Sequence, residues 1–297
     1  MNAAELASQF RIAGVVEFAD TEHGLAKAQI SLGGMTGELF PQGAQVAAWQ
    51  PPGQRPVIFT SPSAVFAPEK AIRGGIPVIF PWFGPHPTDP KAPQHGIVRA
   101  APWRLDAVER EGDAVTLTLS LTPDDFALTY RVTFGRELRL DLAVRNISGQ
   151  EAGFEEALHT YFAVSDVERV SVSGLEGSSF VDKTAGFARR PPAGAALTLT
   201  KETDSVYLDT PDTLTVRDPG FGRRIVIAKE GAGSAIVWNP WAEKAAALAD
   251  LGADNWRPMV CVETGNVGEN RIRLAAGAEH RMTTRIAVNA DGEIRAR

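Results

Sequence analysis

An alternation of apolar and polar residues with a period of two is the feature that most constrains how this chain can fold. Residues 115–122 read VTLTLSLT, so that Val and Leu alternate with Thr and Ser. The same alternation returns in residues 126–134 and 138–144. Such a segment is typical of an antiparallel strand that covers a core with one face. Turn residues between the segments predict a meander, and further strands are expected at residues 196–200, 213–217, 223–228, 234–238 and 281–288.

Helical patterns are few and short. The clearest covers residues 240–251, where Asn239 can cap the helix, Pro240 fits its first position and an alanine-rich stretch follows. A weaker pattern covers Ala3–Phe10. The chain has no low-complexity linker and no repeat of the length that solenoids use. We therefore predict a single all-β domain over residues 1–297, built as a β-sandwich of mostly antiparallel strands.

Charge and apolar content exclude several classes of protein. The chain has 30 Lys and Arg against 36 Asp and Glu, and it lacks a basic run, which argues against nucleic-acid binding. The longest apolar stretch, residues 74–84, is too short for a bilayer and is interrupted by two prolines. Residues 1–14 lack the pattern of a secretory signal. We expect a cytoplasmic protein without a membrane segment, whose oligomeric state stays open and is compatible with a monomer.

Signatures of cofactor and metal chemistry are missing from the sequence. There is no Walker loop, no GxSxG elbow and no HExxH motif, and the five histidines form no close ligand pair. The one cysteine, Cys261, lies in the apolar run 259–262, which favours a core position over a nucleophile. We therefore predict neither a metal nor a cofactor.

Two arginines lie in segments that are suited to ligand binding. Arg73 precedes two glycines, which allow the backbone to approach a ligand closely, although a surface arginine before a buried strand fits equally well. Arg99 lies near Gln94 and His95 after a proline-marked turn. These three side chains offer a neutral amide, a titratable ring and a forked cation, and the alternative is an ordinary polar loop.

Two further segments supply groups for acid and base catalysis. Strand alternation in residues 155–164 puts His159 on one face with Ala157 and Tyr161, where a core histidine is the alternative. Glu263 follows four apolar residues, so we expect it at the end of a buried strand, where partial desolvation raises the pKa of a carboxyl group. The alternative is a solvated glutamate.

Asp204 precedes a short strand-like segment in residues 201–210. Its carboxylate is able to accept hydrogen bonds from ligand hydroxyls, and the alternative is a turn-forming aspartate. Taken together, the candidate residues predict an acid/base pair of His159 and Glu263 among hydrogen-bonding groups. Such a set suits proton transfer on a small polar ligand.

Five segments in this order resemble the glucose-6-phosphate 1-epimerases, a branch of the aldose 1-epimerase superfamily. The resemblance covers roughly residues 20–290, and it rests on the segments RGGIPVIFPWFG, PQHGIVR, ALHTYF, ETDSVY and VCVETGNV. It implies a galactose-mutarotase-like β-sandwich, or supersandwich. It also implies cofactor-free interconversion of the α and β anomers of a hexose 6-phosphate, with this small sugar phosphate as the partner of the protein.

The resemblance also implies a role for each matching residue. Glu263 matches the base that takes the proton of the C1 hydroxyl, and His159 matches the acid that protonates the ring oxygen. The matches to the substrate ligands are Arg73, Gln94, Arg99 and Asp204, with His95 as a secondary candidate. Arg73 and Arg99 are the two expected to hold the phosphate. Thr264, Val98 and the short proline-rich loop at residues 85–93 depart from the usual pattern, and the loop affects the expected phosphate end.

Other readings of the sequence stay open. The chain is alternatively a mutarotase for unphosphorylated aldoses, or a sugar-binding protein without activity on the same fold. Three further cations near the middle of the chain are expected to be solvated surface charges, namely Lys183, Arg189 and Arg190.

Overall fold

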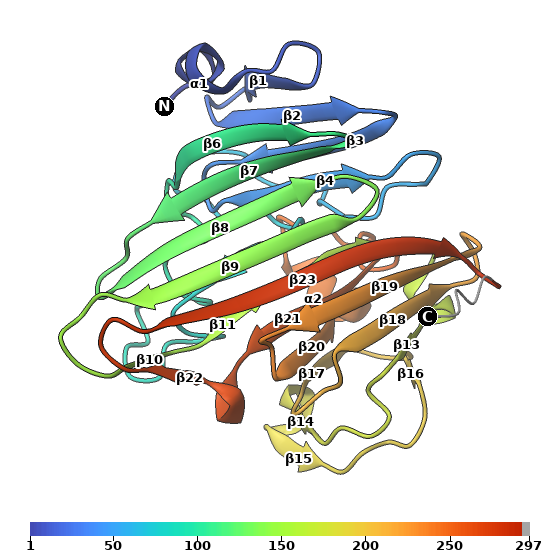
Figure 1. Ribbon diagram of the computed structural model, residues 1–297. Coiled ribbons are helices and arrows are strands. Elements are labelled where there is room, and N and C mark those ends of the chain that lie inside the picture. The colour runs from blue at the N-terminus through green and yellow to red at the C-terminus, as the bar shows by residue number, and fades with distance from the viewer. Residues whose placement is uncertain (293–297) are drawn as a thin grey trace.

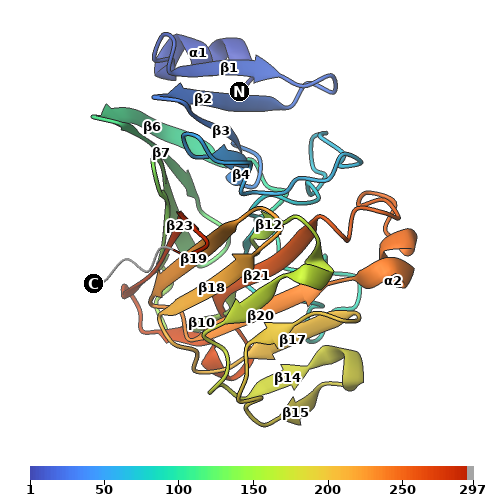
Figure 2. The same cartoon turned by 90° about the vertical axis from the view of Figure 1, so that its right-hand side faces the viewer.

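Two large antiparallel sheets make up most of the computed structural model, which describes residues 1–292 (Figures 1 and 2). The larger sheet has nine strands in the order β16-β13-β18-β19-β23-β9-β8-β7-β6. Its strands are β6 (Arg104–Glu111), β7 (Ala114–Leu121), β8 (Phe126–Phe134), β9 (Leu138–Asn146), β13 (Ser171–Ser173), β16 (Leu197–Thr198), β18 (Thr213–Asp218), β19 (Arg223–Glu230) and β23 (Glu279–Ala290).

The second sheet has eight strands in the order β15-β14-β17-β20-β21-β11-β5, and β12 also pairs with β21. Its strands are β5 (Val78–Ile79), β11 (Glu156–Leu158), β12 (Tyr161–Ala163), β14 (Phe180–Asp182), β15 (Ala188–Arg190), β17 (Thr203–Tyr207), β20 (Ser234–Asn239) and β21 (Met259–Asn266).

Smaller elements complete the fold. A four-stranded sheet and helix α1 lie at the top in Figures 1 and 2, while the β14–β15 hairpin lies at the bottom. These elements are β1 (Val16–Asp20), β2 (Ala26–Leu32), β3 (Met35–Phe40), β4 (Gln45–Gln50), the pair β10 (Ala152–Phe154) and β22 (Ile272–Leu274), α1 (Ala3–Phe10), α2 (Trp241–Ala247), and the 3-10 turns η1 (Val167–Arg169), η2 (Lys183–Ala185) and η3 (Gly268–Asn270).

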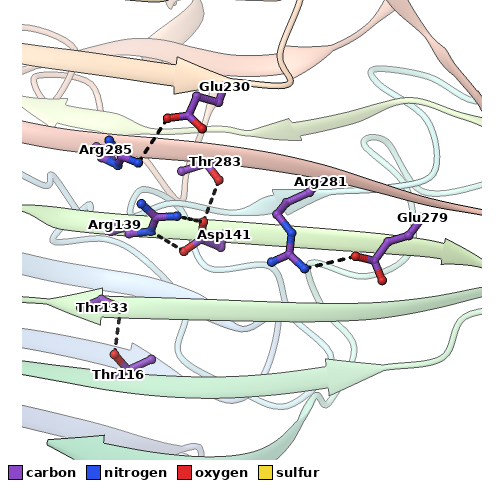
Figure 3. Close-up of polar contacts among 9 residues, drawn as sticks. All are labelled: Thr116, Thr133, Arg139, Asp141, Glu230, Glu279, Arg281, Thr283 and Arg285. Carbon is purple, nitrogen blue, oxygen red and sulfur yellow. Dashed lines mark hydrogen bonds and ion pairs between the residues drawn. The ribbon is translucent and has the colours of Figure 1, made fainter. Parts of the chain in front are cut away.

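The nine-stranded sheet confirms the alternation that the sequence predicts. Leu117 and Leu119 of β7 are fully buried, whereas the neighbouring Thr116 and Thr118 are half-buried on the opposite face. Polar contacts within and between strands lie on that outer face (Figure 3). Asp141 accepts two hydrogen bonds from Arg139, each 2.7 Å long, and one of 2.7 Å from the Thr283 hydroxyl. The inner face therefore supplies apolar side chains to the core, while the outer face satisfies its own polar groups.

The eight-stranded sheet is more deeply buried at its centre. All residues of β20 and β21 are buried, because one face packs on the nine-stranded sheet and the other is covered by loops. The hydroxyls of Thr264 in β21 and Thr284 in β23 are 2.6 Å apart and join the two sheets across the core. Side chains that alternate with Thr264 along β21, such as Cys261 and Glu263, consequently point away from the nine-stranded sheet.

The two predicted helices are present, and one is shorter than expected. Helix α1 has the predicted bounds. Helix α2 ends at Ala247 and not at residue 251. The chain leaves the helix through a turn in which the Leu251 N–H donates to the Leu248 carbonyl, and this turn buries Leu251 completely. The cap residue is Pro240, while the Asn239 side chain accepts from the Trp241 N–H at 2.9 Å. Within residues 1–292, no helix has the length and apolarity that crossing a membrane requires.

A buried ion pair also joins the two sheets. The carboxylate of Glu156 in β11 is fully buried and lies 2.9 Å from Nε2 of His280 in β23. The Asn266 amide donates to the same carboxylate at 2.9 Å. Burial by itself lowers the pKa of His280, but the hydrogen bond and charge of Glu156 outweigh burial, and the net pKa is raised above 6.5.

We expect this pair to make the stability of the fold depend on pH. A raised histidine pKa contributes stability that is complete below the unfolded value of about 6.5 and is lost as pH rises through the folded pKa. His280→Gln is expected to flatten the dependence of the unfolding free energy on pH above about 6.5, measured by denaturant titration. The exposed histidine variant His23→Gln is the control. Identical slopes in His280→Gln and the unaltered protein would contradict this role.

Candidate active site

All seven site residues predicted from the sequence line one cavity of about 320 Å³. It lies on the face of the eight-stranded sheet that points away from the nine-stranded sheet. Loops between β4 and β6 supply one wall of the cavity, and strands β17, β20 and β21 supply its floor. The seven residues are Arg73, Gln94, His95, Arg99, His159, Asp204 and Glu263.

Strand register explains how the floor of the cavity is built. Asp204 pairs with Trp238, Trp238 with Cys261, and Cys261 with Tyr161, so these four side chains form a row on one face. Asp204 lies inside β17, so the turn-forming alternative for this residue is wrong. Glu263 also lies in the interior of β21, and the expectation that it ends a strand is wrong because pairing with β11 and β20 extends β21 to Asn266.

His159 lies at the break between β11 and β12, both of which pair with β21. Its N–H donates to the Pro77 carbonyl at 3.0 Å, and its ring stacks on Tyr161 with 4.8 Å between ring centres. These contacts leave Nδ1 of His159 3.4 Å from Oε1 of Glu263. The two groups that the sequence pairs as acid and base are therefore neighbours.

Both members of this pair keep a buried polar atom without a hydrogen-bond partner. Nδ1 of His159 and Oε2 of Glu263 are unpaired in the described structure. The other such atoms there, on Tyr130, Glu156 and Arg223, belong to residues that do not line the cavity. Because burying an unpaired polar atom costs about 1–3 kcal/mol, the two groups have the character of ligand-binding groups and not of stabilising ones.

Burial shifts the pKa values of the two groups in opposite directions. It lowers the pKa of His159 well below 6.5, and the charges of Arg99, Arg73 and Lys183 add to this shift. It raises the pKa of Glu263 well above 4.5, although the charge of Lys183 opposes the shift. Both shifts disfavour the charged forms of the two groups, so burial favours a neutral imidazole beside a neutral carboxyl group.

The two arginines of the cavity differ in their partners. Arg73 donates from Nε to Asp250 at 3.1 Å and from a terminal nitrogen to the Tyr161 hydroxyl at 3.2 Å. The side chain of Arg99 makes no hydrogen bond or ion pair with any residue of 1–292, and burial lowers its pKa, with the charge of Arg73 adding to this effect. A guanidinium group with all its donors free in a half-buried wall is suited to binding an anion.

His95 supports the loop that carries Arg99. Its ring Nδ1 accepts from the Gly84 N–H at 3.2 Å, and its edge meets the Phe83 ring. Burial and the charges of Arg99, Lys183 and Arg73 lower the pKa of His95 to about 3, so the ring is neutral. Gly96 follows with a φ of 75°, where a Cβ atom would collide with the Phe80 carbonyl. Glycine at position 96 therefore allows the loop to pack directly against the backbone of Phe80, the residue that follows strand β5.

Lys183 is a cavity residue that the sequence analysis assigned wrongly to the solvated surface. Its ammonium group lies 3.1 Å from Oδ1 of Asp204, and its side chain is only 18% exposed. A three-residue turn after a short strand gives no periodic signal that could have indicated this position. Arg189, by contrast, is exposed and pairs with Glu269. Trp238 of the floor and Asp250 beside Arg73 were also not predicted.

Comparisons with known proteins identify relatives that cover most of the chain. Residues 27–287 match the family described as aldose 1-epimerase. A protein of Cenchrus ciliaris is 35% identical over 85% of this chain and 80% of its own length. A protein of Escherichia coli K12 is 34% identical over 77% of this chain and 79% of its own. Both carry the name "Putative glucose-6-phosphate 1-epimerase".

Solved structures confirm the predicted galactose-mutarotase-like sandwich. A Salmonella typhimurium protein described as a "putative mutarotase" superposes with a TM-score of 0.88 at 27% identity, over 95% of this chain and 96% of its own. A galactose mutarotase-like protein of Clostridium acetobutylicum superposes with a TM-score of 0.65 at 13% identity, over 93% of this chain and 98% of its own. At that identity the second comparison shows the fold alone.

Proposed function

Since the chain belongs to the aldose 1-epimerase family, we propose that it interconverts the α and β anomers of a hexose 6-phosphate. Acid/base catalysis is supported by the buried pair of His159 and Glu263. Each of these residues has an unpaired polar atom, and both line the same cavity. The observation that supports a phosphorylated substrate is the unpaired guanidinium group of Arg99 in the wall of that cavity.

In the proposed reaction, Glu263 takes the proton of the C1 hydroxyl while His159 gives a proton to the ring oxygen. The C1–O5 bond breaks as the C1 carbonyl forms, and the sugar opens to an aldehyde. Rotation about the C1–C2 bond then presents the other face of the carbonyl. The hydroxyl at C5 attacks that face with the roles of the two residues reversed, so that the protein regains its starting protonation.

The reaction requires His159 to be protonated and Glu263 to be ionised. Burial and the nearby cations lower the pKa of His159, and burial raises the pKa of Glu263, so both shifts oppose this arrangement in the free protein. A phosphate dianion bound at Arg99 would offset these cations and favour the protonated imidazole. The same group would thus hold the substrate and prepare the acid.

Arg73 has a different place in this proposal. Two of its nitrogens already donate to Asp250 and Tyr161, so we assign Arg73 mainly to the orientation of these side chains and to the positive potential of the wall. Gln94 and Asp204 would bind sugar hydroxyls, because an amide donates and accepts whereas a carboxylate accepts.

Magnetisation-transfer NMR of glucose 6-phosphate at anomeric equilibrium tests the proposal, with free glucose as the comparison. We expect the protein to accelerate exchange of the phosphorylated sugar much more than exchange of glucose. Acceleration of glucose alone would keep the reaction and contradict the phosphate site. Folded protein that accelerates neither sugar would contradict the proposed function.

A further inference from the structure

We propose that Lys183 is a substrate-positioning residue, whose ammonium group and the Asp204 carboxylate together bind two neighbouring hydroxyls of the sugar ring. This inference rests on the proposed function and adds to it a determinant of which hexose is accepted. It assigns a binding role to a residue that lies far from the arginines in the sequence.

The contacts of Lys183 place it inside the cavity and leave it able to bind a ligand. Its Nζ atom is 3.1 Å from Oδ1 of Asp204 and 5.1 Å from the centre of the Phe83 ring. Both charged side chains line the cavity and are mostly buried, at 18% and 15% exposed. An ammonium group has three donors and a carboxylate has two acceptor oxygens, so the ion pair leaves donors and an acceptor free for a sugar.

The backbone around Lys183 fixes its position before a ligand binds. Strand β14 pairs with β17 so that Asp182 is opposite Ser205, which brings Lys183 beside Asp204. The Asp182 carboxylate then accepts from the N–H of Thr184 at 3.1 Å and from its hydroxyl at 2.6 Å, and this closes the turn η2. Because the turn is held by its own side chains, little order has to be gained on binding.

Two adjacent hydroxyls match this pair of charges. One hydroxyl donates to the carboxylate of Asp204, while its neighbour accepts from the ammonium group of Lys183. Hexoses that differ in configuration at one carbon have the hydroxyl of that carbon in either the equatorial or the axial position. A fixed donor beside a fixed acceptor would therefore accept one orientation of the two hydroxyls and reject the other.

Lys183 also contributes to the chemistry that the pair of His159 and Glu263 performs. Its charge opposes the raised pKa of Glu263, and so it favours the ionised carboxylate that acts as base. Loss of the charge should consequently move the acidic limb of the pH–rate profile towards higher pH. A role confined to the folding of the β14–β15 hairpin would leave that limb where it is.

Lys183→Met tests the inference, because it retains the length of the side chain and removes the charge. Two quantities are measured for glucose 6-phosphate and for its 2-, 3- and 4-deoxy analogues. They are the dissociation constant, by calorimetry, and kcat/KM. A lost hydrogen bond to a charged group is expected to cost about tenfold to a hundredfold with the full substrate. For the analogue that lacks the hydroxyl bound by Lys183, the same substitution should cost little, since the interaction is already gone.

Arg189→Met is the matched control, since it also removes one cation from the same hairpin but at an exposed site. It should behave like the unaltered protein, and thermal unfolding should be similar for both variants. Full activity of Lys183→Met, or an equal loss with every analogue, would overturn the inference. Binding of the sugar phosphate without turnover would contradict the proposed reaction and still test Lys183, whereas an absence of binding would overturn both proposals.

Discussion

Glu263→Gln is expected to slow the interconversion of glucose 6-phosphate anomers by about a hundred- to ten-thousand-fold, and His159→Asn should have an effect of the same order. Each substitution preserves the approximate shape of a buried side chain while it removes the ability to exchange a proton. Magnetisation-transfer NMR measures the rate, and thermal unfolding shows whether the variants are folded. Because the two residues act on the same proton transfers, the double variant should be scarcely slower than either single one.

Cys261→Ala is a control for this prediction on the same strand and the same face as Glu263. Its side chain is fully buried, so the variant should lose some stability through the small cavity that it creates, while the chemistry is retained. Near-full activity of either Glu263→Gln or His159→Asn would show that the role assigned to that residue is wrong.

Arg99→Gln is expected to lower kcat/KM for glucose 6-phosphate by about tenfold to a hundredfold and to change the value for glucose little. The reason is that hydrogen bonds between ionised groups contribute about 1.5–3 kcal/mol, and only the phosphorylated sugar makes them. Part of the loss should appear in kcat, if the phosphate also favours protonation of His159. Kinetics with both sugars over a range of concentrations separate the two contributions.

Arg104→Gln supplies the comparison for Arg99, because Arg104 is an exposed arginine that pairs with Asp106 and does not line the cavity. Equal losses of kcat/KM for glucose and glucose 6-phosphate in Arg99→Gln would show that the phosphate does not bind at Arg99. Arg73 is less suitable for the test. Its replacement would also leave Asp250 and Tyr161 without their partner, so a loss of activity would have two explanations.

The sequence allowed seven strands of the nine-stranded sheet to be predicted, all except β6 and β13, but the eight-stranded sheet only in part. Strands such as β7 have one buried face and one partly exposed face, so apolar and polar residues alternate visibly in the sequence. Strand β21 is buried on both faces and shows a continuous apolar run at residues 259–262 that stops at Glu263, which looks like a strand end. Strands β11 and β12 have three residues each, too few for a period to be recognised.

In the site, too, residues in distinctive local segments could be predicted from the sequence, whereas residues placed by long-range contacts could not. His159 and Glu263 could be predicted because each lies in a distinctive local segment. Lys183 could not, since its place in the cavity depends on the pairing of β14 with β17 and on its contact with Asp204. Likewise, the partnership of Arg73 with Asp250 joins residues that are 177 positions apart in the chain.

Strand β21 restricts the changes in chain length that this protein tolerates. Thr264 points into the core toward Thr284, and Glu263, its immediate neighbour, points into the cavity. Deleting one residue before Glu263 would exchange the two faces and bury a carboxylate between the sheets. A point substitution in β21 leaves this alternation intact, whereas an insertion or deletion moves Glu263 out of the cavity and damages the core together. Length variation among descendants of this chain should therefore accumulate in its loops and spare this strand.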